Sequence, residues 1–439
     1  MRRYDVLRVL LLCLLLSTSV AYADTASTIR TRIAEQQQKI AALEKEIAEF
    51  ESKLLEIGKN KSTLASEITR LDTSRKKLSS SITSTQDRVK KANLEIARLS
   101  DEITDRSLKI ERGRIAIQSS LRTVQKADDM TLLEQFYSAA GFEVFWRDID
   151  SLTRLQHTIH DTAAALALEK VALADTREGV SEQKAELSSL AVQLSGQKSV
   201  LDQNRSEQAT LLAQTKQSEV AYQKLLKEKQ EARAQFEQEL SQFESQLEYT
   251  LNPSALPRAG KGVLGWPVDP DFMSRCADRQ STFKNLFCLT QYFGYTEFAR
   301  SGAYKGSPHN GIDFGTPTGT KIVAAASGTV RAVGNTDEYR GCYSYGKWVL
   351  VEHGNGLTSL YAHLSHISVS EGSAVPRSGL VGYSGKTGYA TGPHLHFTLF
   401  ASDGVRLVRL GDIKSKTNCA NATVPVAPTS AYLDPLTYL

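Results

Sequence analysis

The chain has 439 residues, of which 41% are hydrophobic, and a formal net charge of +4. Its length allows about two to four domains, and its apolar content allows at least one packed core. The near-neutral charge balance excludes a strongly basic nucleic-acid-binding protein, so we expect no nucleic acid partner.

An export signal is predicted at the N-terminus. Three arginines precede or flank an apolar run from Val9 to Leu16, and a small-x-small cleavage site ends at Ala23. The run is shorter than the ~20 residues of a membrane-spanning helix. We therefore predict that residues 1–23 are a signal peptide and that the protein is exported to the cell envelope, periplasmic or extracellular. Loss of three arginines and one aspartate with this segment lowers the formal net charge to +2.

Residues 24–250 carry the seven-residue apolar repeat of a coiled coil. One position of the repeat is apolar from Ile33 to Val124, except at Lys61 and Arg75. A second, less regular series follows from residue 173 to about residue 247. Such repeats place a narrow apolar seam on a long helix, which pairs with another helix of the chain or with a second copy.

Residues 126–165 separate the two series, and there aromatic side chains replace the repeat. Two arms of roughly 90 residues, each about 140 Å long as a helix, favour a long antiparallel hairpin with a helical tip near this segment. The aromatic side chains either pack within the tip or form a docking face. A purely structural spacer is the remaining alternative for the hairpin.

A second domain is predicted after the hairpin. Residues 251–261 contain prolines and glycines and read as a linker. Residues 262–439 are rich in Gly, Val, Thr and Tyr and contain short alternating runs, which are typical of an antiparallel all-β domain. The expected fold class is therefore α + β in separate domains, a coiled-coil hairpin followed by a mostly antiparallel β domain.

Four cysteines lie in this C-terminal domain, so disulfides are expected in an exported chain. Three pairings are open, and we favour Cys276 with Cys288 and Cys342 with Cys419. A second zinc site is the alternative, but no C-x-x-C spacing supports it.

Three histidine motifs carry the candidate chemistry. They are His309-Asn310-Gly311-Ile312-Asp313, Tyr361-Ala362-His363 and His394-Leu395-His396. Imidazole nitrogen and carboxylate oxygen are natural zinc ligands, and a catalytic site needs three of them with one open position. Because alternate residues of a strand face the same side, the two histidines of the last motif can share one cleft.

These motifs resemble the LytM/lysostaphin family of peptidoglycan endopeptidases, over residues 262–439. The segments HNGIDF, AAASGTV, VEHGNGLTSLYAHLS, GYSGKTG and GPHLHF occur in the order that the family shows. The resemblance implies that His309, Asp313 and His396 hold one zinc ion, and that His363 and His394 are catalytic residues that orient water and move a proton. Which of the two acts as base stays open.

The resemblance also implies the substrate, the peptides of peptidoglycan, cut in a stem or a cross-bridge. A long insertion before His309, with two cysteines, departs from the family and leaves open whether glycine bridges or D-alanyl cross-links are cut. The other histidines, among them His353 and His366, are interpreted as structural.

The combination of coiled coil and LytM-type domain is similar to division-associated murein hydrolase activators. That similarity implies regulation by the coiled coil and a membrane-protein partner at its tip. It also supplies the alternative function, a coiled-coil adaptor that activates other cell-wall hydrolases without cutting. Stoichiometric zinc and hydrolysis of the wall would favour the enzyme.

Overall fold

The computed structural model describes residues 28–50, 53–54, 63–128, 142–247, 254, 256–278, 288–296, 299–300, 307–413 and 417–439. The predicted signal peptide, residues 1–23, lies outside this part of the chain. The chain divides into two compact units, one of Met1–Ala41 with Thr85–Ala191 and one of Ala42–Ser84 with Val192–Leu439.

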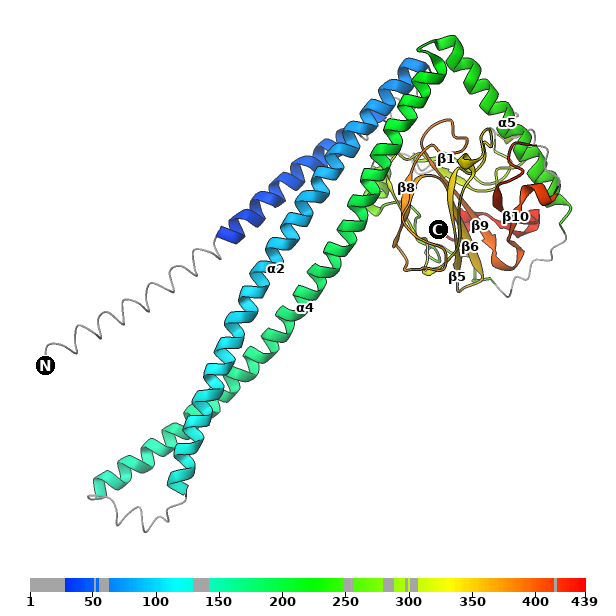
Figure 1. Ribbon diagram of the computed structural model, residues 1–439. Coiled ribbons are helices and arrows are strands. Elements are labelled where there is room, and N and C mark those ends of the chain that lie inside the picture. Colours follow the sequence, from blue (N-terminus) through cyan, green and yellow to red (C-terminus); the bar gives the residue numbers. More distant parts are fainter. Residues whose placement is uncertain are drawn as a thin grey trace. The chain divides into compact units, whose positions relative to one another are not determined.

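Long helices form the N-terminal part, as the sequence predicts. Residues 28–50 are helical, α2 spans Leu64–Asp128 and α4 spans Phe142–Thr215. Neither long helix contains proline. Helix α2 and helix α4 lie side by side in opposite directions (Figure 1), and Arg106 of α2 pairs with Glu169 of α4 at 2.9 Å. The coiled-coil geometry itself stays a prediction.

Most of the predicted tip continues a long helix. Helix α4 already begins at Phe142, so the segment between α2 and α4 is confined to residues 129–141, which lie outside the described residues. The docking role of the aromatic side chains therefore stays a prediction. None of the helices in the described part of the chain is both long enough and apolar enough to cross a membrane.

The second arm is broken, whereas its repeat predicted one helix to about residue 247. Lys216 and Gln217 adopt positive φ angles of 49° and 61°, and this left-handed backbone ends α4 at Thr215. Helix α5, Glu219–Ser245, then starts with Ser218 as its N-cap, whose side chain accepts from the Ala221 amide. No glycine marks this break in the sequence.

The C-terminal domain is an antiparallel β domain, as predicted. A short helix, α6, precedes it at Pro270–Asp278. The strands in the described part of the chain are β1 Leu289–Gln291, β2 Ile312–Phe314, β3 Lys321–Val323, β4 Gly328–Asn335, β5 Lys347–His353, β6 Leu357–Ile367, β7 Ala374–Val375, β8 Leu380–Ser384, β9 Leu395–Ala401, β10 Arg406–Arg409, β11 Thr423–Val426 and β12 Tyr432–Leu433.

Ten of these strands form one sheet, in the order β1-β2-β9-β6-β5-β4-β7, with β12 paired to β9 and β8 paired to both β3 and β6. Strands β10 and β11 pair separately. Figure 1 shows β5, β6 and β9 as neighbours at the centre of the sheet.

The sheet separates two apolar cores. On β9, Leu395, Phe397 and Leu399 belong to one core, whereas Phe400 belongs to the other, because successive side chains alternate between the faces. The second core also includes Phe236 and Leu240 of α5. The even-numbered face of β9, which carries His396, is therefore the face against which α5 packs.

Two disulfides close the domain. Cys276 pairs with Cys288, and Cys342 pairs with Cys419, so both favoured pairings are confirmed. The first clips α6 to the segment before β1, and the second joins the loop before β5 to the segment before β11.

Candidate metal centre

Two paired strands position the three predicted metal ligands. Asp313 of β2 lies directly opposite His396 of β9 in the antiparallel ladder. His309 precedes β2 and forms a backbone bridge with Gly294. Backbone pairing thus fixes the spacing of all three residues before any ligand binds.

The three side chains converge on one point. His309 Nε2 lies 3.2 Å from His396 Nδ1, and Asp313 Oδ1 lies 3.4 Å from the first nitrogen and 2.9 Å from the second. All three residues are buried, and their ligand atoms lie within 4.8 Å of one another. Three electron-pair donors facing each other at this distance need a shared cation or proton, so the cluster fits a divalent metal ion.

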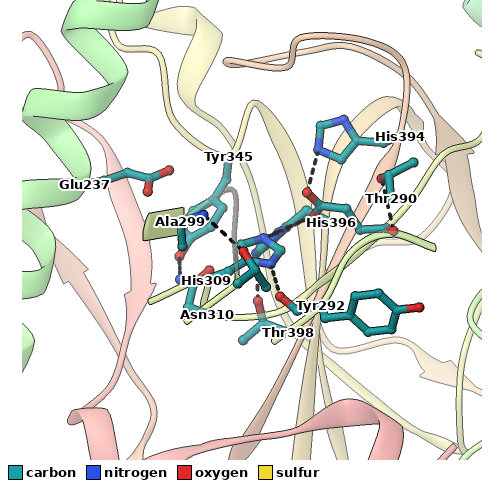
Figure 2. A network of polar contacts seen from close by, with 12 residues as sticks. Glu237, Thr290, Tyr292, Ala299, His309, Asn310, Tyr345, His394, His396 and Thr398 are labelled. Atoms are coloured by element: carbon teal, nitrogen blue, oxygen red, sulfur yellow. Dashed lines mark hydrogen bonds and ion pairs between the residues drawn. The ribbon is translucent and has the colours of Figure 1, made fainter. Parts of the chain in front are cut away.

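Outer partners fix the orientation of both imidazoles. His309 Nδ1 lies 3.0 Å from the Tyr292 carbonyl oxygen, and His396 Nε2 lies 2.9 Å from Thr398 Oγ1 (Figure 2). When each of these nitrogens carries the proton, the opposite nitrogen keeps its lone pair for a metal. Two imidazoles and one carboxylate with such partners are a ligand set that could hold a metal ion.

The carboxylate of this cluster is held ionised. Burial opposes the charge of Asp313, but the neighbouring His309 and His394 outweigh it and hold its pKa well below the usual range. Burial also opposes protonation of His309, yet the Asp313 charge and hydrogen bond leave its pKa raised. For His396 burial prevails and lowers the pKa, which favours the neutral imidazole that binds metals.

The two predicted catalytic histidines lie beside the cluster. The ring centroids of His363 and His394 are 4.6 Å apart, and His394 Nε2 is 3.8 Å from Asp313 Oδ2. His363 Nδ1 lies 2.9 Å from the Thr387 carbonyl oxygen, and His394 Nδ1 lies 2.9 Å from that of Gly392. Donation at these nitrogens leaves each Nε2 free to accept a proton. The structure therefore brings all five predicted site residues together.

His363 has a strained backbone. Its φ is +60°, in the left-handed region that few residues with a side chain adopt, and it lies where the pairing of β5 and β6 shifts register. Its amide donates to the Tyr345 carbonyl at 2.9 Å, which holds this conformation. Such strain costs about 1–3 kcal/mol and is concentrated at functional sites.

Tyr345 and Asn310 are site residues that the sequence did not single out. Tyr345 is buried, and its ring centroid lies 6.0 Å from that of His396. Asn310 Nδ2 donates to Tyr345 Oη at 3.1 Å (Figure 2). Burial, reinforced by the charge of Glu244, raises the pKa of Tyr345, so the hydroxyl keeps its proton. Asn310 was part of a quoted motif, but no spacing signal marked Tyr345.

Helix α5 covers this site within the same unit. A cavity of about 110 Å³ is lined by His309, His363 and His396 on one side and by six residues of α5 on the other. Those six residues are Arg233, Phe236, Glu237, Leu240, Ser241 and Glu244. Figure 2 shows Glu237 pointing from the helix towards Tyr345.

Charged and aromatic contacts extend the cover along the loops beside the cavity. The Arg233 guanidinium lies 4.8 Å from the ring centroid of Tyr389 and pairs with Glu237 at 2.7 Å. In helix α2, Glu67 pairs with Lys386 at 2.8 Å. Lys386 immediately precedes Thr387, the residue whose carbonyl orients His363, so this ion pair contacts the loop that orients the His363 side chain.

Comparison with known proteins agrees with this geometry. Residues 307–407 match the model of peptidase family M23. This range includes all five site residues.

Three relatives illustrate the similarity. The chain is 43% identical over 93 residues to the peptidoglycan DD-endopeptidase ShyA of Vibrio cholerae, covering 21% of this chain and 20% of ShyA. It is 38% identical over 111 residues to the DD-carboxypeptidase/endopeptidase Mpg of Neisseria meningitidis, covering 24% of each. It is 39% identical over 92 residues to the glycyl-glycine endopeptidase ALE-1 of Staphylococcus capitis, covering 21% of this chain and 24% of ALE-1. The chain thus spans a quarter or less of each relative.

Proposed function

We propose that this protein is an exported zinc-dependent endopeptidase that hydrolyses peptide bonds in peptidoglycan stem or cross-bridge peptides. The observation that carries the proposal is the convergence of His309, Asp313 and His396, with the free Nε2 atoms of two further histidines beside them. A structural metal site would have no need of the second pair. The names of the relatives support the substrate class.

The chain's own residues supply the remaining chemistry. A zinc ion in this site contributes Lewis acidity and makes water a nucleophile near neutral pH. His363 and His394 are placed to take a proton from that water and to pass it to the leaving amine. Because the Tyr345 hydroxyl accepts from Asn310, its own proton is available to a substrate carbonyl on which negative charge develops.

The position of α5 supports regulation by the helical part. Phe236 and Leu240 are buried against the core of the β domain, and the same helix face lines the cavity at the metal ligands. A peptide substrate would need the space that α5 occupies. We therefore propose that docked α5 inhibits the enzyme and that its release activates it.

The test is the release of new amino termini from purified peptidoglycan sacculi by the full-length chain, together with zinc per chain. His309→Ala is expected to abolish both. His157→Ala, which removes an exposed histidine of α4, is the matched control and should change neither. Unaltered hydrolysis by His309→Ala would contradict the proposal.

The covered site also supports the second candidate, an adaptor that activates other wall hydrolases. Zinc binding without release of amino termini, together with stimulation of a separate hydrolase, would establish it. Either function fits a partner on the helical part, where Leu108, Trp146 and Leu168 have 50%, 54% and 73% of their surfaces exposed. A membrane protein, or a second copy of the coiled coil, is the proposed partner.

A further inference from the structure

A buried glutamate of α5 accepts hydrogen bonds from the β domain, in addition to the apolar packing of this helix. Glu244 is 5% exposed. Its Oε1 accepts from the Tyr432 hydroxyl of β12 and from the Ala427 backbone amide, the latter at 3.3 Å. Two donors of the β domain thus converge on a single oxygen atom.

The tyrosine among these donors lies in the cavity of the metal centre. Tyr432 and Glu244 both line it, together with His309, His363 and Tyr345. Asn310, which donates to Tyr345, also interacts with the side chain of Tyr432. Asn310 thus links the two tyrosines.

A further polar group of the cavity lacks a partner. Ser344 lines the cavity and is 6% exposed, and its Oγ has no hydrogen-bond partner within the described part of the chain. A buried hydroxyl without a partner is costly, so this wall offers an unused hydrogen-bonding group to a polar ligand.

We propose that Tyr432 Oη and the Ala427 backbone amide form a receptor for a backbone amide carbonyl of the peptide substrate, and that Glu244 occupies this receptor while α5 is docked. The carbonyl is a non-scissile one, because Tyr432 is not among the residues that converge on the metal centre. This subsite rests on the proposed peptidase function and adds a substrate-binding contact to it.

The charges around the receptor favour a neutral carbonyl over a free carboxylate. Arg233 and Glu237, the charged residues that line the cavity besides Glu244, pair with each other at 2.7 Å. Apart from the histidines of the metal centre, the described lining residues therefore leave no unpaired cation for an anion. In agreement, burial raises the pKa of Glu244 to about 8, so the group that fills the receptor near neutral pH is mostly the uncharged acid.

The experiment compares Glu244→Ala with Glu244→Ala/Tyr432→Phe in the full-length chain. The substrate is a cross-linked stem-peptide dimer, accompanied by analogues in which each non-scissile amide carbonyl in turn is reduced to a methylene. Glu244→Ala is expected to lower KM for the unmodified peptide, because it empties the receptor. Adding Tyr432→Phe should raise KM about threefold to tenfold, the loss of one neutral hydrogen bond, and leave kcat within about twofold.

The analogues identify the carbonyl. For one of them Tyr432→Phe should have no effect, because its partner is already missing. The receptor proposal would be overturned if Tyr432→Phe changed KM equally for every analogue, or if it changed KM for no peptide. A peptide with a free carboxylate that binds Glu244→Ala more tightly than its carboxamide would overturn the assignment of a neutral carbonyl.

Controls separate this proposal from the peptidase function. Tyr295→Phe removes the hydroxyl of an exposed tyrosine and should leave KM unchanged. Thermal melting reveals whether Glu244→Ala perturbs the fold. Tyr432→Phe in the chain that keeps Glu244 is the matching single variant for this comparison. If no variant cleaves any peptide, the peptidase function fails, and anisotropy of a labelled uncleaved peptide still tests whether Tyr432→Phe weakens binding.

Discussion

Two glutamates connect the helices to the β domain within one unit, and their surroundings are opposite. Glu67 of α2 lies between two cations, 2.8 Å from Lys386 and 2.6 Å from Arg70. Glu244 of α5 accepts from a tyrosine hydroxyl and a backbone amide. Burial disfavours the charge of both carboxyls, but the cations lower the pKa of Glu67 whereas the pKa of Glu244 rises to about 8. The charge of the neighbouring groups, and not the residue type, therefore decides whether the pKa of a buried glutamate is raised or lowered.

The largest effect is expected from the apolar part of the α5 contact. Phe236 is 4% exposed, so Phe236→Ala should weaken docking of α5 by about 3–5 kcal/mol. Hydrolysis of sacculi should rise more than tenfold, and hydrogen exchange of α5 should accelerate. Val220→Ala, on the same helix but 79% exposed, is the matched control. Faster exchange without faster hydrolysis would show that α5 does not inhibit.

A smaller effect is expected from the ionic contact of α2. Lys386→Met leaves the buried Glu67 with Arg70 as its remaining cation, so the contact should weaken by about 3 kcal/mol. Thermal melting should reveal the loss, and the double variant Glu67→Gln/Lys386→Met should recover part of it. A double variant that melts lower than Lys386→Met would contradict a pairwise ionic contact.

The pH dependence should distinguish the two contacts. Because the pKa of Glu244 is raised, its contact is strongest below the ordinary value of 4.5 and weakens as pH rises to about 8. The fall in the docking constant is at most about tenfold per pH unit. Because the pKa of Glu67 is lowered, its contact is complete above 4.5 and is lost as pH falls further.

The measurement is hydrogen exchange of α5, corrected for its intrinsic pH dependence, from pH 5 to 9. Glu244→Gln keeps a neutral acceptor for Tyr432 and Ala427 and should make the docking constant independent of pH above 5. Glu67→Gln should leave the rise in exchange above pH 6 unchanged. If the native chain and Glu244→Gln show the same exchange of α5 as a function of pH, ionisation of Glu244 is not the cause of the pH dependence.

The smallest effect is expected from the exposed ion pairs of the long helices. Arg114 and Glu111 of α2 lie 2.7 Å apart, with 64% and 51% of their side chains exposed. Solvent and salt screen such a pair, so Arg114→Ala should change the melting temperature by less than about 1 °C. A larger change would mean that Arg114 takes part in a further contact of α2 that stabilises the fold.

The convergence of the five site residues was predicted by the resemblance to the LytM/lysostaphin family, and strand alternation added that His394 and His396 can share one cleft. In the structure, Asp313 of β2 lies opposite His396 of β9, and His394 directly precedes β9. Metal binding at this cluster is still a prediction. The roles of His363 and His394 in proton transfer are still predictions. The division into long helices and an antiparallel β domain was equally readable from periodicity.

What the sequence did not predict depends on contacts between distant segments. Tyr345 lies outside the histidine motifs, and its place beside Asn310 depends on the loop before β5. Glu244 lies within the second helical repeat, whose pattern concerns only apolar positions, yet it is buried against Tyr432, 188 positions further along the chain. The break after Thr215 escaped because Lys216 and Gln217, not glycine, adopt the left-handed backbone.

The convergence of the candidate metal ligands depends on the register in which β2 pairs with β9. Asp313 faces His396 directly, so a slip of one residue would set Leu395 in its place and turn the imidazole to the opposite face. A misfolded chain of that kind could keep its sheet and both disulfides. The fraction of refolded protein that takes up zinc would therefore count correctly registered molecules, which a circular dichroism spectrum cannot distinguish from slipped ones.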